Sequence, residues 1–216
     1  GGAFSSAFSS AFSIGTFVNA TYISVLKVLG TRAYGMIGNG GFDEPFCYDI
    51  AADVFVSIAG VASGVNTPPS PPSSGAWTPP TMDLIGSKMI VTHPGFTGVG
   101  TDFFGVIDLA NPAAPVWSVE NTTGNALPSV PVAVKQFNNR AWFAVNPATG
   151  TPGAYYSDVL APTVVTAGTQ VLTFGDNQPL TALGALPFNN QLGGIIQSLM
   201  VFKGVSNIFQ VTGDFA

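Results

Sequence analysis

Short stretches in which apolar residues alternate with polar ones recur along most of the chain. Four of them share one form: a polar turn leads into an apolar run, and in three cases the run opens near a basic residue. They span Thr31–Ile37, Ser87–Thr92, Asn139–Val145 and Ser198–Lys203. Alternation over a few residues is typical of a half-buried strand. The pattern therefore predicts an all-β protein.

The four stretches are spaced evenly. Arg32 and Lys88 lie 56 residues apart (88 − 32), and Lys88 and Arg140 lie 52 apart (140 − 88). Further short strands follow each stretch, so the repeating unit is an antiparallel meander of about 50 residues, as in a propeller blade. One small meander cannot bury both of its faces alone, whereas stacked meanders can. We therefore predict repeated propeller-like meanders that form a partial β-propeller, with a β-sandwich as the alternative.

The same spacing predicts how the chain is divided. We expect a propeller-like domain over residues 30–216, preceded by a low-complexity arm and a first strand over residues 1–29. The units of this domain are expected near residues 30–65, 81–120, 127–175 and 180–216. A Pro-rich linker over residues 66–80 favours polyproline geometry, which makes it a stiff spacer between the first two units.

The arm repeats Ala-Phe-Ser at a period of four residues and places Phe4, Phe8 and Phe12 in register. Serine is a mediocre helix former and no charged pairs support a helix here. One interpretation is an extended or poorly ordered arm. The other is an arm whose phenylalanines dock on a neighbouring subunit, and these three residues are our interface candidates.

The amino-acid composition excludes several classes of protein. The chain has 216 residues, of which 6 are basic and 11 acidic, and its net charge is −5. A mean hydropathy of +0.40 excludes a disordered chain, and a pI near 4.4 argues against sequence-led nucleic-acid binding. Gly and Ser interrupt the longest uncharged stretch, so we expect no membrane-spanning segment. So few charges indicate a surface that is largely covered by other subunits.

Candidate chemistry is sparse. His93 is the only histidine and ends a strand, so we expect it to form structural hydrogen bonds. The densest acidic patch comprises Asp43, Glu44, Asp49 and Asp53. Paired carboxylates can serve glycoside hydrolysis or bind calcium, but carboxylates in loops usually form turns. We expect no metal, no cofactor and no catalytic residues, and we interpret the chain as a non-enzyme.

Large apolar side chains are expected to fill the core. Trp77, Trp117 and Trp142 could stack on sugars or bases, but burial between sheets is the more common role. Cys47, the single cysteine, lies within a predicted strand and is expected to act as a small buried hydrophobe. With one cysteine, the chain is not a disulfide scaffold.

Several segments of the sequence, taken together, resemble one protein family. They are Phe42–Asp49, Ile90–Phe96, Phe104–Asp108, Asn111–Trp117, Phe137–Phe143, Tyr156–Thr163, Leu172–Asp176, Ser198–Lys203 and Ile208–Asp214. Over roughly residues 30–216 the chain is similar to the tail nozzle, or tail tubular, proteins of short-tailed bacteriophages. Those proteins are usually much longer than this chain.

The resemblance implies a structural virion protein located in the phage tail. Such proteins carry propeller-like domains and form a hexameric ring below the adaptor ring. They contact tail adaptor and tail fibre proteins, and phage DNA passes through the ring without sequence-specific binding. The family brings no active site and no cofactor. The alternative from another class is a carbohydrate-binding or carbohydrate-cleaving propeller domain, and a secreted adhesin-like domain is a third hypothesis.

Overall fold

The computed structural model describes residues 20–71, 77–189 and 195–213. All regular secondary structure in these residues is β-structure, which confirms the all-β prediction. The strands form four successive antiparallel sheets and one small parallel pair. None of the described residues belongs to a helix long and apolar enough to cross a membrane.

Each sheet is built from strands that are neighbours in the sequence. The first comprises β1 (Ala20–Leu29), β2 (Arg32–Asn39), β3 (Phe42–Asp49) and β4 (Val54–Val56). The second comprises β5 (Thr81–Ile85), β6 (Lys88–Thr92), β7 (Phe104–Asp108) and β8 (Val116–Glu120). The third comprises β10 (Pro131–Phe137), β11 (Arg140–Val145), β12 (Gly153–Tyr156) and β14 (Val171–Thr173). The last comprises β15 (Leu180–Asn189), β16 (Ile195–Lys203) and β17 (Asn207–Val211), while β9 (Thr123–Gly124) pairs with β13 (Val164–Val165).

The four stretches that repeat in the sequence are the second strands of these sheets. They correspond to β2, β6, β11 and β16, and each is preceded by a first strand that it pairs with in antiparallel register. The first sheet therefore begins at Ala20 in β1 rather than near residue 30. The meander, not the single strand, is the unit that repeats.

Hydrophobic clusters join each sheet to the next. Tyr34 and Met36 of the first sheet pack with Met89 and Val91 of the second. Ile90 points to the other face of β6, because side chains alternate along a strand, and it packs with residues of the third sheet. On β11, Phe143 faces the second sheet and Trp142 faces the last. The middle sheets thus bury both faces.

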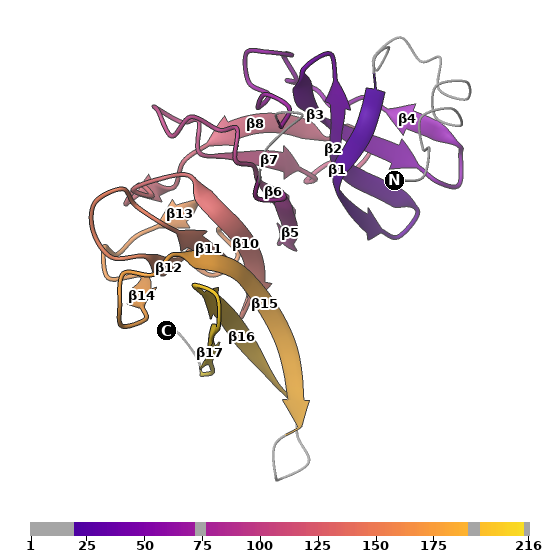
Figure 1. Ribbon diagram of the computed structural model, residues 1–216. Helices are drawn as coiled ribbons and strands as arrows, with labels where there is room; N and C mark the ends of the chain where they lie inside the picture. Colours follow the sequence, from indigo (N-terminus) through magenta and orange to yellow (C-terminus); the bar gives the residue numbers. More distant parts are fainter. Residues whose placement is uncertain (1–19, 72–76, 190–194, 214–216) are drawn as a thin grey trace.

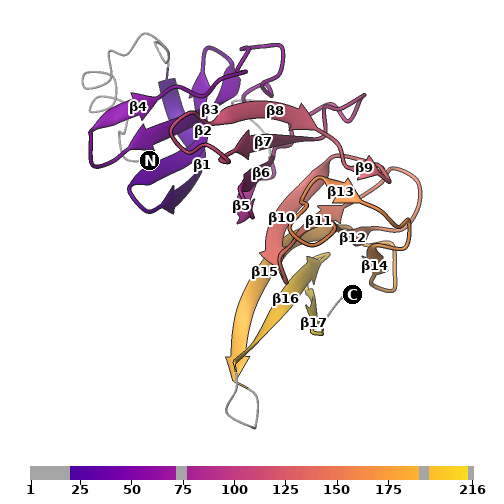
Figure 2. The same ribbon diagram turned by 180° about the vertical axis from the view of Figure 1, so that it is seen from behind.

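The sheets are stacked in chain order, with the first at one end and the last at the other (Figures 1 and 2). The first strands of consecutive sheets contact one another, as β1 does β5, β5 does β10, and β10 does β15. A row of first strands is the arrangement expected on the axis side of a propeller. The architecture is consistent with a partial propeller, and each adjacent pair of sheets is also sandwich-like.

Tight turns set the register of the meanders. Asn138 and Asn139 connect β10 to β11 with positive φ angles of 50° and 55°. A two-residue hairpin with both central residues in this region matches the twist of the strands, and asparagine tolerates it well. The β2–β3 hairpin uses Gly40 and Gly41 in the same way, with φ angles of 60° and 95°.

The described part of the Pro-rich segment packs against the first sheet. The amide of Asp43 donates to the carbonyl of Pro68 at 2.8 Å, and the amide of Ser70 donates to the carbonyl of Gly41 at 2.9 Å. Pro68 is buried in this contact. The segment therefore covers the start of β3 in addition to connecting two sheets.

Candidate functional site

The single histidine and the acidic patch meet between the first two sheets, although they lie far apart in the sequence. Asp43 is on β3, and His93 directly follows β6. His93 Nε2 lies 3.1 Å from Asp43 Oδ2. The side chain of His93 is 1% exposed and that of Asp43 is 0% exposed. The pair is thus closed off from solvent.

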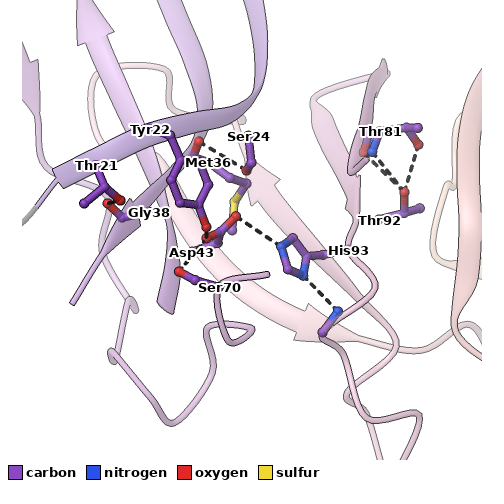
Figure 3. Close-up of polar contacts among 11 residues, drawn as sticks. Thr21, Tyr22, Ser24, Met36, Gly38, Asp43, Ser70, Thr81, Thr92 and His93 are labelled. Atoms are coloured by element: carbon purple, nitrogen blue, oxygen red, sulfur yellow. Dashed lines mark hydrogen bonds and ion pairs between the residues drawn. The ribbon is translucent and has the colours of Figure 1, made fainter. Parts of the chain in front are cut away.

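Two more groups complete this centre from the first sheet and the segment after it. The hydroxyl of Tyr22, on β1, donates to Asp43 Oδ1 at 2.5 Å. The hydroxyl of Ser70 donates to the same oxygen at 2.9 Å. Figure 3 shows the carboxylate of Asp43 between these two hydroxyls and the ring of His93. We call these four residues the Asp43 cluster.

The backbone fixes the tautomer of His93. The amide of Gly95 donates to Nδ1 at 3.0 Å, so Nδ1 is an acceptor and carries no proton. Nε2 therefore carries the hydrogen and donates it to Asp43. The rings of Trp77 and Phe96 lie against the imidazole, with centroids 5.4 Å and 6.1 Å away. Both nitrogens of the ring are occupied, as expected for structural hydrogen bonding.

The surroundings of the cluster change the acidity of its members. Burial raises the pKa of Asp43, but hydrogen bonds from His93, Tyr22, Ser24 and Ser70 together outweigh it, so its pKa lies below the usual range. Burial, and then the hydrogen bond to Asp43, raise the pKa of Tyr22 well above its ordinary value. Asp43 is therefore a carboxylate and Tyr22 a neutral phenol at neutral pH.

Asp43 and Glu44 do not form a pair that could act on a glycoside. They are neighbours on β3, so their side chains leave opposite faces of the sheet. Glu44 instead accepts a hydrogen bond from Asn39 Nδ2 at 3.0 Å. Both side chains are buried in the strand, with exposed fractions of 0% and 4%. The expectation that these two carboxylates form loops or turns was wrong, because the strand begins at Phe42.

The other two acidic residues of the patch do lie at a turn. Asp49 Oδ1 accepts the amides of Ala51 and Ala52 at 3.1 Å and 3.0 Å. Asp53 accepts the hydroxyl of Tyr48. In the described ranges, no three His, Cys, Asp or Glu residues come together as a metal site would require. The patch is thus distributed over separate contacts.

A second polar centre, around Asp83, joins three sheets. Asp83 lies on β5 and is 4% exposed. Its carboxylate binds Lys27 of β1, and its Oδ2 lies 2.9 Å from Nζ of Lys135 on β10. The backbone N–H of Gln136 also donates a hydrogen bond to Oδ2 of Asp83, at 2.9 Å. Burial raises the pKa of Asp83, but Lys27, the Gln136 amide and Lys135 outweigh it and hold the pKa below its usual range.

Thr81 extends this connection between β5 and β10. Its Oγ1 accepts the amide of Val134 at 2.8 Å, two residues before Gln136. Side chains at alternate positions of β5 thus accept amides at alternate positions of β10. This arrangement satisfies backbone donors that lie outside any strand ladder. The second and third sheets are therefore joined through their first strands by side-chain-to-backbone bonds.

The charge on Asp83 should make the stability of the protein depend on pH. Because its pKa is lower in the folded than in the unfolded chain, this stabilisation is present above the unfolded pKa, near 3.9, and is lost as the pH falls through the folded value. We expect Asp83→Asn to be about 2 kcal/mol less stable than wild type near neutral pH. The difference should shrink below about pH 4. Urea unfolding at several pH values measures it, and a pH-independent difference would contradict this role.

The large side chains mostly lie where the sequence predicted. Trp117 and Trp142 are buried in the core, and so is Cys47, as expected. Trp77 is half-buried against His93. The interface candidates Phe4, Phe8 and Phe12 lie outside the described residues, so their role stays a prediction.

Most contacts of the two polar centres have no local signal in the sequence. Tyr22 and Ser70 carry no local signal for a contact with Asp43. Asp83 did carry one, because a carboxylate within a short apolar strand is almost never buried without partners. The two lysines that bind it lie 56 and 52 residues away along the chain, as expected for neighbouring repeats.

Comparison with known proteins does not assign this chain to a family. No family model matches the sequence, and no curated protein matches it. The functional conclusion therefore rests on the residues themselves, their arrangement and the resemblance of the sequence phrases.

Proposed function

We propose that this chain is a structural virion protein of a short phage tail, forming part of a nozzle ring. The main support is the position of the sequence segments that resemble the nozzle family. In the structure these segments form strands and turns of the stacked sheets. Phe42–Asp49 is β3, Phe104–Asp108 is β7, and Ser198–Lys203 ends β16. A resemblance concentrated in the framework supports a structural role.

The two polar centres, around Asp43 and around Asp83, also support a structural role. In the Asp43 cluster every polar atom of the carboxylate and the imidazole is used by another group of the protein. A general acid or base must instead reach a substrate. Asp83 likewise binds groups from its neighbouring sheets. Both centres join neighbouring sheets, and this supports a structural role.

The proposed role is physical. A ring of these subunits would continue the DNA channel, with adaptor proteins on one side and tail fibres attached outside. DNA would pass through it without sequence-specific contacts. The low charge of the chain fits extensive burial between subunits, because buried interface cores are depleted of charged residues.

The assembly state tests this function. We expect purified protein to form a closed multimer visible by mass photometry and by negative-stain electron microscopy. A stable monomer at high concentration would contradict the proposal. So would cleavage of any glycan on a broad substrate panel by the wild-type protein, because the proposed structural role includes no catalysis.

A further inference from the structure

The hairpin between β2 and β3 carries an asparagine that is followed by a glycine. Asn39 ends β2, Gly40 and Gly41 form the turn, and Phe42 begins β3. No other asparagine of the sequence precedes a glycine. The backbone nitrogen of Gly40 and the side-chain carbonyl carbon of Asn39 have the spacing along the chain that closes a five-membered ring. Glycine has no side chain to hinder this closure.

The turn is accessible to water. Gly40 and Gly41 are exposed, and Asn39 is half-buried. A Cβ added at Gly40 would meet no atom within 4 Å. Asn39 and Phe42 form the last pair of the β2–β3 ladder, and the end of a ladder opens more readily than the core. Such local opening gives the backbone of Asn39 the freedom that ring closure requires.

The side chain of Asn39 is directed at a buried carboxylate. Its Nδ2 donates to Glu44 Oε2 at 3.0 Å, across the hairpin. The side chain of Glu44 is buried, and a buried carboxylate is costly without hydrogen-bond donors. Replacing the amide of Asn39 by a carboxylate would remove this donor and bring two negative charges together.

We propose that Asn39 is a site of spontaneous deamidation through Gly40. The backbone nitrogen of Gly40 attacks Cγ of Asn39, the bond between Cγ and Nδ2 breaks, and Nδ2 leaves as ammonia with the proton from Gly40. A five-membered imide remains. Water then opens the imide at Cγ to give aspartate, or at the backbone carbonyl to give isoaspartate, in which the chain runs through Cγ. Neither step oxidises or reduces the chain, and water is the only other reactant.

The modification weakens the start of β3. The new carboxylate faces Glu44 without a hydrogen bond, and isoaspartate adds one carbon to the backbone. A two-residue turn between paired strands does not accommodate that extra carbon without a change of register. The same turn holds the Pro-rich segment, since the amide of Ser70 donates to the carbonyl of Gly41 at 2.9 Å. Deamidation therefore loosens this segment from the first sheet.

Ageing of the folded protein tests the site. Purified protein is incubated in mildly alkaline buffer, which favours attack by the backbone nitrogen, and is then digested with pepsin in acid, which stops the reaction. Mass spectrometry of the peptides should show Asn39 converted, with an amino group replaced by a hydroxyl group. Asn139 is the matched internal control, because it lies in the turn of the β10–β11 hairpin but precedes Arg140. We expect Asn139 to stay an amide.

Two results of this experiment would overturn the proposal. One is an Asn39 that stays an amide in the folded protein, even if the urea-unfolded chain converts in parallel. The other is equal conversion at Asn39 and Asn139, because the glycine and the open turn would then have no effect.

A second experiment tests whether the new charge acts through Glu44. Asn39→Asp reproduces the aspartate product and should lower the equilibrium constant for folding about tenfold, as expected when a buried acceptor loses its donor. In Asn39→Asp combined with Glu44→Gln, the amide at position 44 can donate to the new carboxylate, so most of the loss should be recovered. Urea unfolding of these variants and of Glu44→Gln completes the cycle. A loss that Glu44→Gln leaves unchanged would overturn the assigned contact.

Discussion

Asp43→Ala should lower the free energy of unfolding by about 4 kcal/mol. The substitution leaves the Nε2–H of His93 and the hydroxyls of Tyr22 and Ser70 without the acceptor that all three use. Each buried donor left unsatisfied costs about 1–3 kcal/mol, and the first two sheets lose a bond that joins them. Urea unfolding followed by tryptophan fluorescence measures the change.

Two further variants make this result specific. Asp43→Asn retains one acceptor oxygen and should lie between Asp43→Ala and wild type. Glu120→Ala removes a carboxylate that accepts a hydrogen bond from Ser118 at 2.7 Å near the end of β8, and it should cost less than about 1 kcal/mol. If Asp43→Ala costs no more than Glu120→Ala, the cluster does not hold the sheets together.

Gly105→Ala should lower the free energy of unfolding by about 2 kcal/mol, although it adds a single methyl group. Gly105 lies on β7, and the indole of Trp117 on β8 covers it so closely that a Cβ would overlap the ring. The ring has little freedom to move, because its Nε1–H donates to the carbonyl of Asn66 at 2.8 Å. Urea or thermal unfolding measures the loss.

Gly184→Ala is the matched control for this substitution. Gly184 also lies within a strand, β15, but the nearest atom to its added Cβ would be a carbon of the Phe202 ring at 3.6 Å, which is ordinary contact. Alanine restricts the unfolded chain, so this variant should be neutral or slightly more stable than wild type. Equal losses at the two glycines would mean that the contact with Trp117 does not matter.

The sequence predicted the second strands well, and it predicted the first strand β1, but it did not predict the first strands β5, β10 and β15. β2, β6 and β11 stand out in the sequence as nearly continuous apolar runs, because each is an interior strand that is buried on both faces. The strand β5 begins at Thr81 and contains Asp83. The side chains of both residues accept hydrogen bonds from backbone amides of β10, in the neighbouring sheet. β10 begins at Pro131, and β15 contains Gly184 and Pro187. Such polar, glycine and proline residues interrupt the apolar runs, so the sequence did not predict these three strands.

The sequence predicted the roles of single residues of the candidate site but not the contacts between them. A hydrogen-bonding His93 at the end of a strand followed from the local sequence, and so did a buried Cys47. The contact between His93 and Asp43 depends on how two sheets are placed relative to each other, which local periodicity does not encode. The position of Asp43 and Glu44 within β3 depends on where the strand starts, and strand boundaries are set by the Gly40–Gly41 hairpin and by pairing with β2.

The chain-order stacking of the sheets has a consequence for biosynthesis. Each hydrophobic cluster is formed by sheets that are adjacent in the sequence, so each closes as soon as one more meander has been made. A nascent chain that folds in this order exposes a single apolar sheet face at any moment, and the next meander to leave the ribosome covers it. Local, sequential closure of this kind favours fast folding and limits aggregation.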